Sequence, residues 1–280
     1  MEHPNMSILE RIHASYYQLT ATEKKVADYV LAHSSQVQFM SITQLADECG
    51  TADASISRFC RSLKLKGFNA FKLELAQHSA GTAKAQEQST DTPSRSQEIR
   101  QLAIEAVSQT IDLAEPQKVL QAVELFEKAP RVFCFGAGGS YLMAQEFAHL
   151  FSTVSAKFTA IPDSHMQMSA VATMGQQDVI VLFSYSGATN GGIQLLELAK
   201  SRGIRTVLVT RFSKSPAAKL ADVVLCCGSN EGPYQFGSVP AKIAQLVVID
   251  YLFQEYYCRN QEACDENRYK IGAVLADMHI

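Results

Sequence analysis

The 280-residue sequence has no long apolar run, no leader-like start and little net charge. A membrane-spanning helix needs about 20 consecutive apolar residues, and no run reaches that length. The opening Met1-Glu2-His3-Pro4 lacks the basic and apolar regions of a secretory signal peptide. The net charge of −3 gives no overall basic signal, so any surface for nucleic acid must be local. We therefore expect a cytoplasmic protein with no membrane partner.

Closely spaced cysteine pairs are also missing. The chain has seven cysteines, an odd number, and no C-x-x-C pair; Cys226 and Cys227 are adjacent. A structural zinc site needs paired ligands at short spacing. Reduced thiols in a cytosolic protein explain this pattern better than disulfides or a metal centre. We expect no metal site.

The first part of the chain, about residues 7–78, predicts helices and no strand. The predicted helices begin with an apolar series from Ile8 to Leu19 and a second helix capped by Thr22. Ser41 is the expected cap of a third helix over residues 42–49, and Gly50 ends it as a glycine does just past a helix C-terminus. A fourth helix is expected over residues 53–63 and a fifth over residues 70–78.

The third and fourth of these helices have the spacing of a helix-turn-helix. Ala46 is a small residue where two helices cross closely, Gly50 lies in the turn, and Ile56 faces back into the core. Leu45 and Phe59 complete the apolar contacts. A plain pair of antiparallel helices in a bundle fits the same spacing. Charge favours the DNA-binding alternative.

Basic charge is concentrated on the fourth helix and just after it. Between residues 54 and 72 the basic residues are Arg58, Arg61, Lys64, Lys66 and Lys72, and no acidic residue occurs. We expect Ser55, Ser57, Arg58 and Arg61 to project together toward a DNA groove, with Lys64 and Lys66 placed for phosphates. A solvated basic face is the alternative.

The segment from residue 79 to 97 has no apolar periodicity and is predicted to be a linker. Two amphipathic helices follow, over residues 98–115 and 116–128, and strands then alternate with helices. The strands are expected over residues 132–135, 158–161, 178–183, 206–210 and 223–226. Such alternation indicates a doubly wound parallel sheet covered on both faces, whose ligands bind beyond the carboxyl ends of the strands.

Two turns rich in glycine and hydroxyl groups follow strands of this sheet. One is Gly136-Ala137-Gly138-Gly139-Ser140, and the other is Ser184-Tyr185-Ser186-Gly187-Ala188-Thr189. Hydroxyls and free N–H groups at a helix N-terminus attract anions. Ordinary capping needs only one hydroxyl, so the second turn favours a phosphate cradle.

Neither turn fits a nucleotide fingerprint. Tyr141 stands where a G-x-G-x-x-G motif has its third glycine, and no lysine follows the glycines as in a Walker motif. We therefore expect no NAD or other cofactor. The hydroxyls of Ser140, Ser184, Ser186 and Thr189 suit the phosphate of a monoester on a small neutral body, with Gly138 and Gly139 beside them.

Three further residues are candidates for contacts to that body. His165 follows the second strand, Glu231 lies in the loop after the fifth strand, and Lys242 begins the last long helix. A partly buried structural histidine and a snorkelling surface lysine are the ordinary alternatives.

The two turns resemble those of sugar isomerase (SIS) domains, and with the helix-turn-helix the whole chain resembles the RpiR/MurR family of bacterial transcriptional regulators. The resemblance implies an all-α helix-turn-helix domain (residues 1–78), a linker (79–97) and an α/β SIS domain with a doubly wound parallel sheet and flanking helices (98–280). It implies a double-stranded DNA operator, a homodimer or homotetramer, and a phosphosugar effector held by Ser140, Ser184, Ser186 and Thr189. N-acetylmannosamine 6-phosphate is among the effectors of the family.

Three functions remain open at this point. The first is a phosphosugar-controlled regulator, a repressor of sugar or amino-sugar catabolism genes, without enzyme activity. The second is a phosphosugar aldose–ketose isomerase, for which Glu231 or His165 would be the base. The third is a DNA-binding architectural protein whose second domain only oligomerises. The basic helix-turn-helix argues against the second and the hydroxyl cluster against the third.

Overall fold

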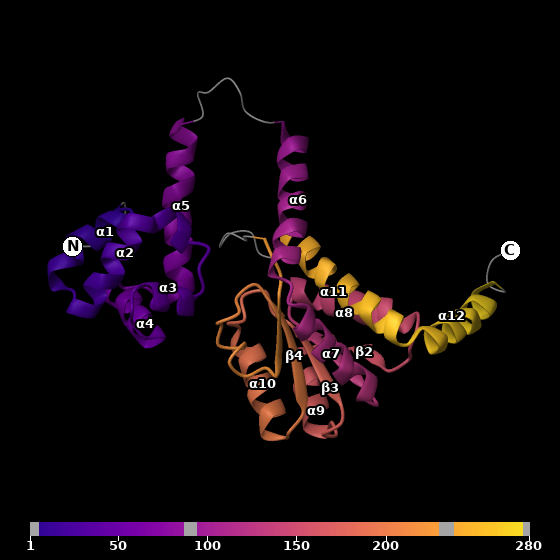
Figure 1. Ribbon diagram of the computed structural model, residues 1–280. Coiled ribbons are helices and arrows are strands. Elements are labelled where there is room, and N and C mark those ends of the chain that lie inside the picture. The colour runs from indigo at the N-terminus through magenta and orange to yellow at the C-terminus, as the bar shows by residue number, and fades with distance from the viewer. Residues whose placement is uncertain (1–5, 87–93, 230–237, 277–280) are drawn as a thin grey trace. The chain divides into compact units, whose positions relative to one another are not determined.

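The computed structural model describes residues 6–86, 94–229 and 238–276 (Figure 1). The chain divides at about residue 99 into two units, a helical unit before it and a sheet unit after it. The helical unit contains α1 (Ile8–Ser15), a 3-10 turn (Tyr16–Gln18), α2 (Ala21–Val37), α3 (Ile42–Glu48), α4 (Asp53–Ser62) and α5 (Phe68–Gln86).

Local capping starts the first three helices. Ser7, Thr20 and Ser41 each accept a hydrogen bond from the backbone N–H three residues on, and the side chain at that position bonds back to the cap. The expectation that Thr22 caps α2 is wrong. Thr20 is the cap because Glu23 lies three residues after it, which places Thr22 inside the first turn.

The helical unit has its own core. Its fully buried side chains come from all five helices and include Ile12, Val30, Leu45, Phe59 and Phe71. Helix α5 runs past its expected end at residue 78 to Gln86, and α6 begins at Arg95, so helix covers both ends of the segment expected to be a linker. Alanine, the best helix former, recurs in residues 80–85, which favours helix without an apolar pattern.

The sheet unit is a five-stranded parallel sheet with helices on both faces, as predicted. The strand order is β2-β1-β3-β4-β5. The elements are α6 (Arg95–Leu113), α7 (Pro116–Lys128), β1 (Val132–Gly136), α8 (Gly139–Ser152), β2 (Phe158–Ala160), α9 (Ser164–Thr173), β3 (Val179–Phe183), α10 (Asn190–Ser201), β4 (Arg205–Thr210), β5 (Val223–Cys226), α11 (Val239–Arg259) and α12 (Gln261–Ala276).

The alternation along β3 shows how the layers form. Val179, Val181 and Phe183 pack with α7, α8 and α11 on one face, while Ile180 and Leu182 pack with α9 and α10 on the other. All five β3 residues are buried, as expected for a central strand of a parallel sheet. Helices α9 and α12 were not predicted from the sequence.

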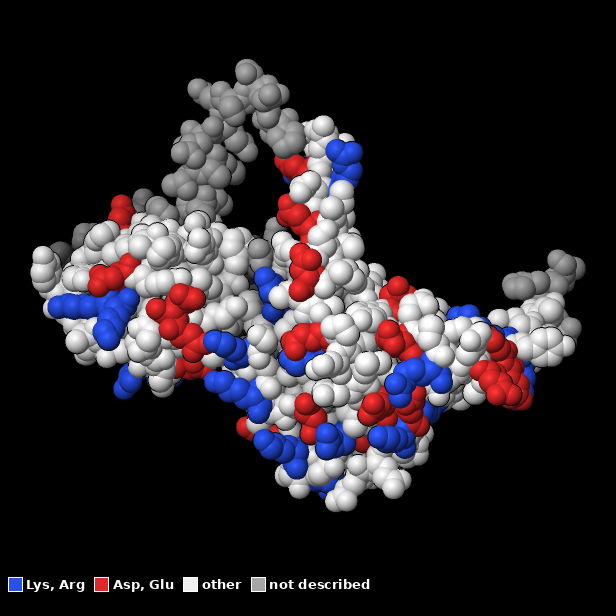
Figure 2. Space-filling view, viewed as in Figure 1, with Lys and Arg blue, Asp and Glu red and all other residues white. Residues whose placement is uncertain are grey.

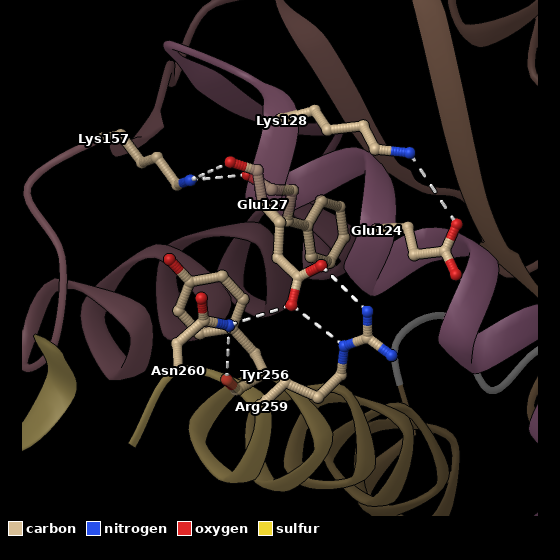
Figure 3. A network of polar contacts seen from close by, with 8 residues as sticks. Glu124, Glu127, Lys128, Lys157, Tyr256, Arg259 and Asn260 are labelled. Atoms are coloured by element: carbon tan, nitrogen blue, oxygen red, sulfur yellow. Dashed lines mark hydrogen bonds and ion pairs between the residues drawn. The ribbon is translucent and has the colours of Figure 1, made fainter. Parts of the chain in front are cut away.

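A polar network ties the end of α7 to the end of α11 (Figure 3). The Glu127 carboxylate accepts two hydrogen bonds from Arg259, at 2.9 and 3.1 Å, and one from Asn260 at 3.1 Å. The Arg259 bond, opposed by burial and aided by Asn260, holds the pKa of Glu127 below its usual value. These contacts fasten two helices of the same sheet face.

Several absences hold for the described part of the chain. No helix there is long and apolar enough to cross a membrane. No group of three or more metal-ligating side chains occurs among the described residues. The seven cysteines, all within the described ranges, are free thiols.

Candidate functional site

Helices α3 and α4 form a tight helix-turn-helix. Gly50 adopts a left-handed φ of +61°, and the Thr51 N–H donates to the Ala46 carbonyl at 2.8 Å, which closes α3. The Thr43 hydroxyl donates to the Asp53 carboxylate at 2.9 Å and links the two helices. Ala46 and Ile56 are both buried, so the helices cross closely where the sequence predicted.

The outward side of α4 carries most of the predicted DNA-contacting residues. Arg58 and Arg61 are exposed, as are Lys64 and Lys66 just after the helix, and Ser57 is half-buried. Ser55 is only 6% exposed, so the expectation that it projects with them is wrong. It lies on the inner edge of α4 beside Ile56, and its hydroxyl accepts a hydrogen bond from Arg58 at 3.2 Å.

The α4 C-terminus places Lys64 in an unusual backbone conformation. Lys64 has a φ of +61°, its N–H donates to the Arg61 carbonyl, and the next N–H donates to the Cys60 carbonyl. This is the position just past a helix where glycine is normally found. The lysine side chain is therefore presented at the end of the basic helix in a fixed backbone geometry.

The sheet unit shows no patch of one sign on the face drawn in Figure 2. Lys and Arg side chains there alternate with Asp and Glu over the sheet and its helices. The candidate nucleic-acid surface is the α4 side of the helical unit, where the four exposed basic side chains lie.

The strand order brings the two hydroxyl-rich turns to neighbouring strand ends. β1 pairs with β2 on one side and with β3 on the other, so the chain reverses its winding direction between β1 and β3. Gly136, the last residue of β1, stands in register with Phe183, the last of β3. Ligands of doubly wound sheets bind at this reversal point.

The first turn follows β1 and needs its glycines. A Cβ on Gly136 would lie 2.6 Å from the Ser140 carbonyl oxygen, so only glycine lets α8 start this close to the strand. Gly138 is the cap residue of α8, with a φ of +55°, and has no side chain to cap the first N–H groups. Ser140 is half-buried in the first turn of α8.

The second turn follows β3 and contains an unusual hydroxyl. Ser184 is 5% exposed, and its Oγ is buried without a hydrogen-bond partner. Buried polar groups without partners are rare and call for an explanation such as a missing ligand. Gly187 has a φ of +58° and packs against Ser215, while the Ser186 hydroxyl accepts a hydrogen bond from the Ala188 N–H at 3.3 Å.

The α10 N-terminus after this turn has no side-chain cap. Thr189 is the cap residue, but its hydroxyl does not bond to the first-turn N–H groups. A Cβ on Gly192 would approach that hydroxyl to 2.9 Å, so the glycine leaves room for it. In the same unit, the N-termini of α9 and α11 do have side-chain caps, Asp163 and Ser238. The uncapped N-termini of α8 and α10 both face the reversal point and favour an anion.

Three residues predicted to contact the ligand remain, His165, Lys242 and Glu231. His165 is exposed in the first turn of α9, which follows β2, and Lys242 is half-buried in the first turn of α11. Helix α11 packs against α8. Glu231 lies outside the described residues.

Sequence reasoning missed Gln167, which supports the first turn. Its side-chain amide is buried and donates to the Gly136 carbonyl at 2.9 Å and to the Ile161 carbonyl at 2.8 Å. Gln167 thereby fixes the ends of β1 and β2 relative to α9. A lone glutamine carries no signal for such a role.

Two family models match the chain. The helix-turn-helix domain of the rpiR family matches residues 6–82, and the SIS domain matches residues 125–254. An uncharacterized HTH-type transcriptional regulator of Caldanaerobacter subterraneus is 31% identical over 252 residues, covering 89% of this chain and 88% of that protein. The chain belongs to the RpiR family of HTH-type transcriptional regulators.

Solved structures of other proteins are similar to this chain in fold. The RpiR-family chain is similar to the Vibrio vulnificus NanR protein complexed with ManNAc-6P, with a TM-score of 0.89, 25% identity, and coverage of 97% of this chain and 98% of that one. A putative phosphosugar isomerase of Bacteroides fragilis has a TM-score of 0.54 at 20% identity, covering 62% of this chain and 97% of that one, and shares the sheet-unit fold alone.

Proposed function

We propose that this RpiR-family regulator is a bacterial repressor of sugar or amino-sugar catabolism genes that responds to a phosphosugar bound at the two hydroxyl-rich turns. The single observation that carries the proposal is the buried, unpartnered Ser184 hydroxyl at the reversal point of the sheet. A phosphate oxygen at this point supplies the acceptor that the Ser184 hydroxyl lacks.

A monoester phosphate suits the surrounding groups. The uncapped N-termini of α8 and α10 offer backbone N–H donors and the positive ends of two helix dipoles. Ser140, Ser184, Ser186 and Thr189 add hydroxyl donors. The glycines at 138, 139 and 187 let the backbone approach the anion closely.

The sugar body extends away from this cradle toward other elements. His165 at the start of α9 and Lys242 at the start of α11 are the residues we assign to it. NanR supports an N-acetylated hexosamine phosphate such as N-acetylmannosamine 6-phosphate, because the similarity covers 97% of this chain and the NanR structure is a complex with ManNAc-6P.

The DNA operator is contacted by the outward side of α4. Arg58 and Arg61 read base edges, while Lys64 and Lys66 contact phosphates, with Ser57 at the edge of the surface. Ser55, buried beneath Arg58, supports that arginine instead of contacting DNA.

The regulator acts as a homodimer or homotetramer. One short recognition helix contacts too little DNA for high specificity, so the helical units of two subunits must bind two half-sites. An apolar stripe on α6 suits self-association, because Ile104, Val107 and Ile111 are 52%, 41% and 55% exposed at helical spacing.

Calorimetric titration with N-acetylmannosamine 6-phosphate tests the cradle. Removal of a hydrogen bond to a charged group costs roughly 1.5–3 kcal/mol, so Ser184→Ala weakens binding by about 10- to 150-fold. The fold is retained, because the hydroxyl has no partner to lose. The control is Ser201→Ala on α10, whose exposed hydroxyl bonds only its own helix.

Two results would count against the proposal. If Ser184→Ala and wild type bind the sugar phosphate with equal affinity, the assignment of the phosphate site to the two hydroxyl-rich turns is wrong. Interconversion of an aldose phosphate that has a hydroxyl at C2 with its ketose isomer, followed by NMR, favours the isomerase alternative. If neither occurs but N-acetylmannosamine 6-phosphate does not bind, a panel of other sugar phosphates in a thermal-shift assay identifies the effector.

A further inference from the structure

One backbone carbonyl in the sheet unit joins the phosphate turn to the loop after β5. The Tyr185 hydroxyl donates to the Ser229 carbonyl oxygen at 2.9 Å, and the Arg211 Nε donates to the same oxygen at 2.9 Å. Tyr185 lies between Ser184 and Ser186, so the turn proposed to hold phosphate is itself bonded to Ser229.

The other side of the same loop is bonded to α6. The Ser229 N–H donates to the Gln109 side-chain oxygen at 3.1 Å, and the Gly228 N–H donates to the Thr110 hydroxyl at 2.9 Å. The Thr110 hydroxyl in turn donates to the Ala106 carbonyl at 2.6 Å within α6. A Cβ on Gly228 would lie 2.5 Å from the Gln109 Cβ, so only glycine allows this close approach.

Ser229 is held in a backbone conformation that serine does not favour. Ser229 has a φ of +81°, a region that non-glycine residues rarely adopt, and it is 4% exposed. Such a conformation persists only where surrounding bonds impose it, and such positions cluster at switch regions. The bonds on both sides of Ser229 are the ones that impose it here.

We infer that Ser229 is a latch through which occupancy of the phosphate turn is transmitted to α6. This inference rests on the proposed function. A ligand that reorients the 184–189 turn moves the Tyr185 hydroxyl, and the strained Ser229 then changes its bonds to Gln109 and Thr110. Helix α6 spans the division between the two units at about residue 99 and follows α5 of the helical unit in chain order.

These contacts also distinguish residues that transmit the signal from residues that bind the ligand. Gln109 and Thr110 lie on α6, away from both turns in the sequence, and accept hydrogen bonds from Ser229 and Gly228. Coupling free energies between sites are reciprocal, so α6 must in the same way influence phosphosugar affinity when operator is bound. Tyr185, Gln109 and Thr110 are therefore positioning residues for regulation.

The test separates binding from coupling. For each variant we would measure the affinity for N-acetylmannosamine 6-phosphate by calorimetry and the ratio of operator dissociation constants with and without that compound. The variants are Tyr185→Phe, which removes the hydroxyl that donates to Ser229, and Gln109→Ala. The matched control is Gln101→Ala, an exposed α6 glutamine that bonds Glu105 one turn on.

The latch predicts that Tyr185→Phe and Gln109→Ala bind the sugar phosphate at least as tightly as wild type, because the bonds they lack are the ones that the ligand disturbs. Their ratio of operator dissociation constants moves toward one by about 2- to 10-fold, the range of one neutral hydrogen bond. Gln101→Ala keeps the wild-type ratio.

Several outcomes overturn the latch. One is an unchanged ratio in both variants, and another is an affinity loss that accounts for the whole change in ratio, which makes the residues parts of the binding site. If the wild-type ratio does not respond to any sugar phosphate, the proposed function fails, and the latch fails with it. A responding wild type with unaffected variants refutes the latch alone.

Discussion

At the scale of single residues, Lys64 combines a basic side chain with a backbone position that suits glycine. Its φ of +61° costs a non-glycine residue about 1–2 kcal/mol. Both Lys64→Ala and Lys64→Gly remove the charge, but only glycine relieves the backbone. We expect Lys64→Gly to have the higher free energy of unfolding of the two, by about 0.5–1 kcal/mol in urea titration.

The same pair of variants tests the DNA contact. Both should weaken operator and random DNA alike, and both should reduce the slope of log affinity against log salt by about 0.9, the contribution of one phosphate contact. Gel shifts over a range of salt concentrations measure this. If the two variants differ in the salt slope as well as in stability, the phosphate assignment of Lys64 is wrong.

At the scale of elements, the turn after β3 depends on Gly187. Its φ is +58°, and a Cβ there would lie 2.1 Å from the Ser215 hydroxyl. Gly187→Ala should therefore lower the free energy of unfolding by about 2–4 kcal/mol and abolish phosphosugar binding. Gly191→Ala is the control, because a Cβ at that helical position meets nothing within 4 Å. Similar stability of the two variants would contradict the described turn.

Helix α7 offers two glutamates for comparison, one inside the polar network with α11 and one outside it. Glu127 accepts bonds from Arg259 and Asn260, whereas the exposed Glu124 lies 3.9 Å from Lys128. Glu127→Gln should lower the free energy of unfolding by about 1 kcal/mol and Glu124→Gln by less than about 0.5 kcal/mol. Equal effects in chemical denaturation would show that the network adds nothing to stability.

The network also predicts a pH dependence. The pKa of Glu127 is lower in the folded chain than its unfolded value, so the folded state binds fewer protons at this group. Its stabilisation is complete above the unfolded pKa, near 4.5, and is lost as the pH falls through the lower folded pKa. Between pH 6 and pH 3 the wild type should therefore lose more stability than Glu127→Gln, as thermal denaturation measures.

Elements whose signals are local were predicted well from the sequence. Ser41 and Gly50 delimit α3 because a cap and a left-handed glycine act within a few residues. Strands such as β3 were found because they are short, continuous apolar runs. Helix α9 was missed because it is short and its apolar residues lie on several sides, including the exposed Met166.

Contacts that depend on distant parts of the chain were not predictable. The direction of Ser55 depends on how α4 rotates against the rest of the helical core, and its neighbours in sequence do not set that angle. Ser229 and Gln109 are 120 residues apart in sequence, so no local pattern links them. The unpartnered state of the Ser184 hydroxyl likewise follows only from the packing around it.

At the scale of the whole molecule, the apolar stripe on α6 predicts self-association. Multi-angle light scattering should show a dimer or tetramer at micromolar concentration. Ile104→Lys and Ile111→Lys should reduce the number of subunits in the oligomer. They should also weaken operator binding, because two helical units can no longer bind two half-sites together. The control is Tyr17→Lys, at a side chain that is 91% exposed in the helical unit. A wild-type monomer with full operator affinity would refute the assembly.

The most direct test of the central claim is a titration of phosphosugar into the complex of protein and operator DNA. The operator is first selected from random duplexes, and N-acetylmannosamine 6-phosphate is the first effector tested. A ligand changes DNA affinity only if it binds the DNA-competent and DNA-incompetent states unequally. The account predicts that wild type releases operator at an effector concentration that rises by about 10- to 150-fold in Ser184→Ala. Release of operator by both proteins at the same concentration would contradict it.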